Sequence, residues 1–133
     1  MVGWGITQDP ISNELIVSDG TPFLYFWDPE TFEEKRKIKV YGRNGKYVNH
    51  LDELEFVHGR VFANVWFKDY ILAIDPATGL VMEEYDFKDL FVPRPRGSNV
   101  LNGISITDKE DELFVTGKRW SSLFRVKIAL PNN

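Results

Sequence analysis

The stretch Asn102-Gly103-Ile104-Ser105-Ile106 repeats a pattern that occurs twice earlier in the chain. The earlier copies begin at Trp4-Gly5-Ile6-Thr7-Gln8 and at Asp52-Glu53-Leu54-Glu55-Phe56, so successive copies start about 50 residues apart. Repeats of roughly 40 to 50 residues that each hold several short strands are typical of propeller blades. The sequence therefore predicts an all-β protein with a β-propeller fold.

Each copy has the same order of apolar strands and polar turns. Asp, Pro, Asn and Gly favour turns and separate the apolar runs, and Asp28-Pro29 and Asp75-Pro76 mark equivalent turns in the first two copies. The expected first strands of the three copies are residues 5–8, 54–57 and 103–107, and the second strands are 15–17, 61–63 and 113–115. The third strands are 24–27, 70–74 and 123–128, and the fourth strands of the first two copies are 37–40 and 81–87. The third copy has no fourth strand in this interpretation.

The sequence predicts one partial propeller domain over residues 1–133. Its blades are expected at about 3–48, 49–100 and 101–130. Complete propellers have at least about four blades. Either neighbouring chains complete the ring or the chain is an N-terminally truncated part of a longer protein, and we favour the second. We expect the full-length protein to be a monomer.

Composition narrows the range of partners. The net charge of −4, from 16 basic and 20 acidic residues, argues against general binding to nucleic acid or to membrane surfaces. No stretch approaches the ~18 apolar residues of a membrane span. The absence of cysteine excludes disulfides and thiolate chemistry. The start of the chain has neither the basic residues nor the apolar run of a signal peptide, and the sequence leaves the compartment open.

Unusual polar and aromatic residues fall at equivalent places in the three copies. The first and second strands of a blade are antiparallel neighbours, so the start of the first and the end of the second lie at the same end of the sheet. Blades radiate from one axis, so these places converge at the mouth of the central channel. The residues expected there are Trp4, Asp19, Asp52, Glu53, Asn64, Trp66, Asn102, Lys118 and Trp120. Such a set predicts a small-ligand site in which a carboxylate with a raised pKa transfers protons.

A purely structural role competes with this interpretation for each single residue. A tryptophan in a β-blade most often packs in the core, Asn102-Gly103 fits a simple turn, and Glu55 fits a structural pair with a lysine. His50 and His58 are the only histidines, and His58 stands in a turn before glycine, which argues against a metal site. The coincidence of several such residues at one end of the blades favours a site.

An ordered set of short strings resembles one known family. The strings are Gly3-Trp4-Gly5, Ser18-Asp19-Gly20, Leu24-Tyr25-Phe26, Asp28-Pro29-Glu30-Thr31, Glu53-Leu54-Glu55, Ala63-Asn64-Val65-Trp66, Leu101-Asn102-Gly103-Ile104, and Leu113-Phe114-Val115-Thr116-Gly117-Lys118 followed by Trp120. Together they resemble the plant-type glutaminyl cyclases (glutaminyl-peptide cyclotransferases) over residues 3–128. The resemblance implies a five-bladed propeller, of which this chain would be the last three blades. It also implies an acyltransferase that converts N-terminal glutamine of peptides and proteins into pyroglutamate and releases ammonia, with no cofactor and no catalytic zinc. A secretory or periplasmic location fits it.

The resemblance also assigns roles to residues. Trp4, Trp66 and Lys118 match active-site positions of the family, with the two indoles as walls around the substrate side chain. The residues expected to bind substrate are Trp4, Asn64, Trp66, Asn102 and Trp120, and those expected to take part in catalysis are Asp52 and Lys118.

The chain departs from the family pattern in several places. Asp52 stands where the family usually has Asn, and an ionised Asp cannot donate a hydrogen bond to a developing oxyanion. Phe67 stands where relatives often have Gln, and Ser121 where Pro is common. The catalytic glutamate of the family lies in a Glu-Gly-Leu string of an earlier blade, and this chain contains no such string. We therefore expect the 133 residues alone to be inactive.

Two other functions remain open at this point. One is a non-catalytic propeller that binds a partner, which Asp52 and the missing glutamate favour. The other is a propeller hydrolase or lactonase with a metal in the channel, for which Asp19, Asp52 and Glu53 are the candidate ligands. The retained Trp4, Trp66 and Lys118 favour the cyclotransferase.

Overall fold

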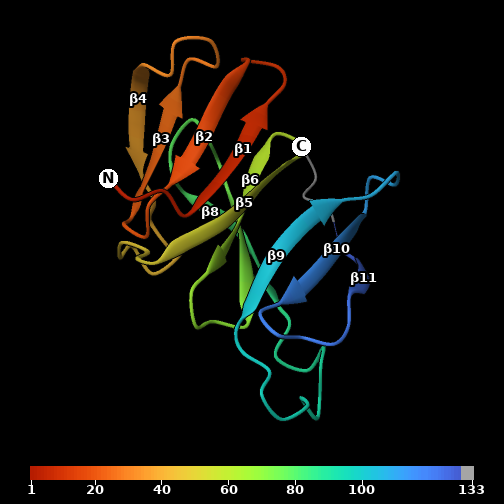
Figure 1. The fold of residues 1–133 in the computed structure, drawn as a ribbon. Coiled ribbons are helices and arrows are strands. Elements are labelled where there is room, and N and C mark those ends of the chain that lie inside the picture. The colour runs from red at the N-terminus through yellow and green to blue at the C-terminus, as the bar shows by residue number, and fades with distance from the viewer. Residues whose placement is uncertain (130–133) are drawn as a thin grey trace.

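The computed structural model describes residues 1–129 and is built from strands and turns (Figure 1). The strands form two sheets of four and one sheet of three. The strands are β1 (Gly5–Asp9), β2 (Glu14–Ser18), β3 (Phe23–Trp27) and β4 (Glu34–Lys39); β5 (Leu51–Val57), β6 (Arg60–Val65), β7 (Tyr70–Ile74) and β8 (Val81–Asp86); and β9 (Leu101–Ile106), β10 (Glu112–Gly117) and β11 (Phe124–Lys127). None of the described residues forms a helix long and apolar enough to cross a membrane.

Each sheet is an antiparallel meander in chain order, which confirms the expected all-β fold and places every expected strand. The turns at Asp28 and Asp75 form as the turn-forming residues of the sequence predict. The carboxylate of Asp28 accepts the amide of Glu30 at 2.8 Å, and the carboxylate of Asp75 accepts the amide of Ala77 at 3.0 Å. These side chains replace backbone partners in the turn and fix the step from the third strand to the fourth.

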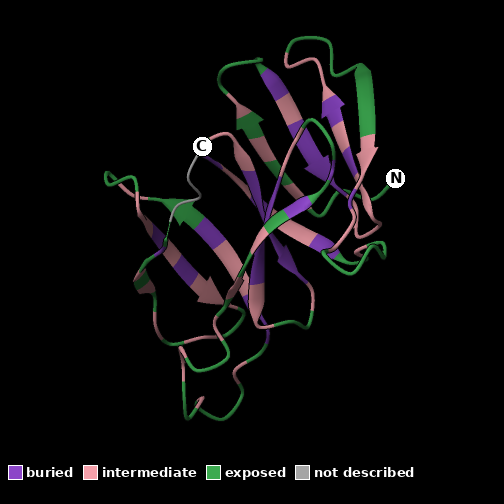
Figure 2. Ribbon diagram, turned by 180° about the vertical axis from the view of Figure 1, so that it is seen from behind, coloured by how far each residue is buried: buried purple, intermediate pink, exposed green. Residues whose placement is uncertain are grey.

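The core lies between the sheets, in two layers. Figure 2 shows the buried residues concentrated on the middle strands of the sheets, such as β2, β6 and β7. Alternation along β6 explains how one strand serves both layers. Val61, Ala63 and Val65 face the layer shared with the first sheet, and Phe62 faces the layer shared with the third. Side chains of a strand alternate between its two faces. The middle sheet is therefore apolar on both sides.

The innermost strands β1, β5 and β9 lie side by side around a common axis (Figure 1). Glu55 of β5 connects all three. Its carboxylate accepts the hydroxyl of Thr7 at 3.4 Å on one side and the amide of Ile106 at 3.2 Å on the other. The expected pairing of Glu55 with a lysine is wrong for the described residues, because neighbouring strands take up both carboxylate oxygens.

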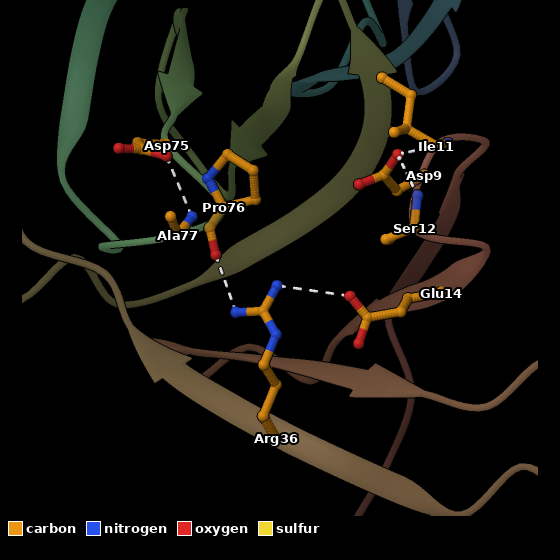
Figure 3. Close-up of polar contacts among 8 residues, drawn as sticks. All are labelled: Asp9, Ile11, Ser12, Glu14, Arg36, Asp75, Pro76 and Ala77. Carbon is orange, nitrogen blue, oxygen red and sulfur yellow. Dashed lines mark hydrogen bonds and ion pairs between the residues drawn. The ribbon is translucent and has the colours of Figure 1, made fainter.

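Arg36 of β4 connects the first sheet to the turn at Pro76 in the second, as Figure 3 shows. Its guanidinium donates to the carbonyl oxygen of Pro76 at 2.9 Å and to the buried carboxylate of Glu14 at 3.5 Å. The same group lies over the ring of Phe26, 3.5 Å from the ring centroid. The bond to Pro76 links the first sheet to the second, and the contacts with Glu14 and Phe26 hold the Arg36 side chain in place within the first sheet.

Candidate functional site

A pocket of about 370 Å³ lies at the end of the sheets where β1 and β5 begin and β6 and β10 end. It is lined by Trp4, Asp52, Trp66 and Lys118. These four residues come from all three sheets and are up to 114 positions apart in the printed sequence. We call this cavity the mouth pocket. It lies where the antiparallel geometry of the first two strands of each repeat predicts a site.

Two indoles form one wall of the mouth pocket. The rings of Trp4 and Trp66 meet edge to face, with centroids 6.0 Å apart and planes at 79°, a favourable geometry for aromatic pairs. The Trp4 indole lies directly over Gly20, where an added Cβ would lie 2.7 Å from the ring. Gly20 also has a φ of 83°, so it is glycine that lets the ring lie on the backbone.

Two residues that the sequence did not assign to the site surround Trp66. The ring of Phe67 lies 4.0 Å from the Trp66 ring, and that of His50 lies 5.8 Å away. The backbone carbonyl of His50 accepts the amide of Trp66 at 2.9 Å. Both His50 and Phe67 have positive φ, at 63° and 68°. Such angles are uncommon for residues other than glycine and occur at binding sites. No strand pattern or spacing in the sequence indicates them.

Asp52 and Asn102 stand at equivalent β-bulges. The register of β5 with β6 shifts by one residue between Leu51 and Leu54. The register of β9 with β10 shifts in the same way between Leu101 and Ile104, where Asn102 stands. A bulge changes the direction of a side chain and is common next to active sites. Here the two bulges turn the side chains toward each other, and the Asn102 amide donates to the Asp52 carboxylate at 2.7 Å.

The carboxylates of Asp52 and Glu53, at the start of β5, are partly buried. Burial raises the pKa of Asp52, while the nearby charge of Lys118 and the hydrogen bond from Asn102 lower it to a smaller extent. Burial also raises the pKa of Glu53, offset in part by the hydrogen bond from the Leu54 amide. An acid with a raised pKa is suited to proton transfer, so Asp52 is a candidate acid–base group of the mouth pocket.

We expect the raised pKa of Asp52 to make stability depend on pH. The folded protein holds a proton that the unfolded chain loses above a pH of about 4, so this group stabilises the fold at low pH, and the contribution disappears as pH rises through the folded pKa. In Asp52→Asn the melting temperature should therefore fall less steeply than in the wild type as pH rises above about 4. Asp108→Asn, in an exposed turn, is the control. Parallel wild-type and Asp52→Asn curves would contradict the expectation.

The two asparagines of the expected set have different environments. Asn102 is half-buried and reaches Asp52 at the pocket wall. Asn64 is fully buried, and its carbonyl oxygen accepts the amide of Gly103 at 3.0 Å, which links the second sheet to the third. The Asn64 amide nitrogen has no hydrogen-bond partner among residues 1–129. Asn64 thus lies behind the pocket lining and supports β9.

Trp120 and Asp19 are not brought into the mouth pocket. The Trp120 ring packs on Phe91 and Phe124, with centroids 5.0 Å and 6.0 Å away, and its indole nitrogen donates to the carbonyl of Asn99 at 2.8 Å. The carboxylate of Asp19 accepts the hydroxyls of Thr21 and Tyr25. Both residues thus make structural contacts in the described part of the chain.

No group of three or more His, Asp or Glu side chains within residues 1–129 is arranged to hold a metal ion. His50 and His58 flank opposite ends of β5. The imidazole of His58 lies 3.1 Å from the carbonyl of Glu110 in the turn between β9 and β10, whereas His50 faces Trp66.

Fold and pocket together define the class: an all-β, propeller-like protein with a pocket lined by indoles, a carboxylate and a lysine where its blades meet. The chain belongs to the glutamine cyclotransferase family, whose model matches residues 1–128. It is 37% identical over 131 residues to a glutaminyl-peptide cyclotransferase of Arabidopsis thaliana, a match that covers 95% of this chain and 40% of the relative.

Solved structures agree with this assignment. The glutaminyl cyclase of Myxococcus xanthus superposes with a TM-score of 0.83 at 35% identity, over 94% of this chain and 54% of that one. BamB from Moraxella catarrhalis, with a TM-score of 0.56 at 12% identity, shares the fold alone. The chain therefore spans about half or less of the length of the family relatives it matches.

Proposed function

We propose that the protein to which this chain belongs converts the N-terminal glutamine of peptides and proteins into pyroglutamate. The observation that carries the proposal is the convergence of Trp4, Asp52, Trp66 and Lys118 from three sheets on one pocket. Membership of the glutamine cyclotransferase family supports it. Peptides with an N-terminal Gln are the proposed partners, and the monomer remains our proposed state of the full-length protein.

In the proposed reaction, the neutral α-amine attacks the side-chain amide carbon of the same glutamine. A C–N bond closes the five-membered ring, the bond to the amide nitrogen breaks, and one proton passes from the attacking amine to the leaving nitrogen, which departs as ammonia. The transition state carries negative charge on the former amide oxygen, so a donor aimed at that oxygen lowers the barrier.

The mouth pocket offers a group for each of these needs. Lys118 is the one cation among the four lining residues and would donate to the developing oxyanion. The indoles of Trp4 and Trp66 would hold the aliphatic part of the glutamine and exclude water. Asp52, whose pKa is raised by burial, would move the proton. Asn102 would act as a positioning residue, because its amide holds the Asp52 carboxylate.

Mass spectrometry of a Gln-initiated peptide tests the proposal directly. The purified chain and the longest protein that its gene encodes are each incubated with this peptide and with an Asn-initiated control. We expect the Gln peptide alone to lose the mass of one ammonia, in at least one of the two proteins. Spontaneous cyclisation is subtracted with a heat-denatured sample. If neither protein exceeds that background, the proposed activity is wrong.

A second candidate is a propeller of the same family that binds such peptides without turning them over. The specific observation is Asp52, which has only acceptor oxygens when ionised and whose neighbouring amide donor, Asn102, is already directed to it. Binding of a Gln-initiated peptide without ammonia release, in the longest gene product, would favour this second candidate.

A further inference from the structure

A second cavity, of about 470 Å³, lies between the connection from β4 to β5 and the surface of the second sheet. His50, which directly precedes the innermost strand β5, lines one end. Val81 and Glu84, which belong to the outermost strand β8, line the other. The cavity therefore runs outward from the axis across the second sheet. We call it the outer cleft.

His50 joins the outer cleft to the mouth pocket. His50 lines the cleft, and its imidazole stands edge to face with the indole of Trp66, which lines the mouth pocket. The His50 amide donates to the carbonyl of Gly20 at 2.8 Å, so the residue is held on both sides by backbone bonds. The two cavities are therefore neighbours across the contact between Trp66 and His50, and a peptide that extended from the mouth pocket past Trp66 would reach the cleft.

The outer cleft carries positive charge in a protein with a net charge of −4. Arg43, Lys46 and Lys68 line it, against the single carboxylate of Glu84. All three cations are exposed. None of them makes an ion pair within 4.0 Å in the part of the chain that the structure describes. Unpaired cations in a concave surface concentrate anions there.

We propose that the outer cleft binds acidic side chains of the substrate downstream of its N-terminal glutamine, so that the site prefers Gln-initiated peptides that carry Asp or Glu. The inference rests on the proposed function for the placement of the glutamine. Strand spacing fixes the range: four strands span three gaps of about 4.8 Å, roughly 14 Å, and an extended chain covers this in about four to five residues. The preferred acids therefore lie between positions 2 and 6.

The test compares six-residue peptides that start with Gln and differ only at positions 2 to 6, which hold two Glu, two Lys or neutral residues. Both kcat/KM and the Kd of a fluorescent derivative of each peptide are measured. The two proteins used are the 133-residue chain and the longest protein that its gene encodes. Each exposed ion pair changes affinity by about two- to fivefold. We expect acidic peptides to bind about tenfold more tightly than neutral ones at low salt, and the difference to shrink as ionic strength rises.

Three variants connect the preference to the cleft. The double substitution Arg43→Ala with Lys46→Ala should remove it, and Lys46→Glu should shift it toward the lysine peptides. Lys109→Ala, which removes an exposed cation in the turn between β9 and β10, should leave it unchanged. Melting temperatures check that each variant is folded.

The outcomes separate this inference from the proposed function. Equal Kd values for acidic and neutral peptides, or a preference that survives the double substitution, would overturn the inference even if the Gln peptides are cyclised. A tenfold acidic preference that the double substitution removes would support the cleft even if no peptide is cyclised, in which case the proposed activity alone fails.

Discussion

Replacing Lys118 with alanine in the longest gene product is expected to lower kcat/KM for a Gln-initiated peptide by about 10² to 10³-fold, the usual effect of removing one donor to an oxyanion. Lys118 supplies the positive charge at the mouth pocket, and its charge acts on Asp52. The fold should not suffer. The Lys118 side chain is exposed, and its backbone is held by hydrogen bonds with Val100 and Asn99 at 2.9 Å each. Truncation of an exposed side chain usually changes stability by less than about 0.5 kcal/mol.

Arg119→Ala is the matched control, because it removes an exposed cation from the next position, outside the mouth pocket. Lys118→Arg keeps the charge but changes the geometry of the donor, and it should restore a part of the rate. The measurement is the initial rate of ammonia release, with melting temperature as the check of folding. A loss no greater than that of Arg119→Ala would show that Lys118 does not act on the reacting amide.

The fold follows from the sequence because its signals are local and repeated. The turns at Asp28 and Asp75 form hydrogen bonds that lie within two or three residues of each carboxylate. The alternating apolar residues of β6 place one face of the strand in each core layer. Such patterns need no knowledge of distant residues. Contacts between the sheets, such as that of Arg36 with Pro76, depend on how the sheets pack. The sequence around either residue does not indicate them.

The candidate site follows from the sequence only in part, for a related reason. Antiparallel neighbours bring strand ends together, and this places Trp4, Asp52, Trp66 and Lys118 in one pocket. Trp120 also follows the end of a second strand, β10, but its ring packs on Phe91 and Phe124 outside the mouth pocket. Its amide donates to the carbonyl of Gly117 at 3.2 Å, and this tight turn folds the indole back over that glycine.

The bulges are a second feature that the sequence does not reveal. The string Asp52-Glu53 gives no sign that the pairing of β5 with β6 slips there. The slip decides that Asp52 faces Asn102 across the gap between two sheets. From the sequence alone, side chains are expected to alternate strictly between the two faces of a strand. A bulge adds one residue, and the side chains beyond it then point to the opposite face from the one expected.

Replacing Gly5 with alanine is expected to lower the free energy of unfolding by about 3 kcal/mol, the upper end of what overpacking costs. An added Cβ at Gly5 would overlap the backbone carbonyl oxygen of Asp52. That oxygen cannot rotate away, and it is held by the hydroxyl of Ser18 at 2.6 Å. The innermost strands β1 and β5 must therefore separate, and Trp4, next to Gly5, must move away from the mouth pocket.

Gly3→Ala makes the same chemical change two residues earlier, where an added Cβ would have no atom within 4 Å. It should leave both stability and substrate affinity unchanged, whereas Gly5→Ala should lower the urea midpoint and weaken binding of a Gln-initiated peptide. The two effects have one cause, because the contact that packs β1 on β5 also fixes Trp4 beside Trp66. If Gly5→Ala were as stable as Gly3→Ala, β1 and β5 would not lie as close as the structure places them, and the shape of the mouth pocket would have to be revised.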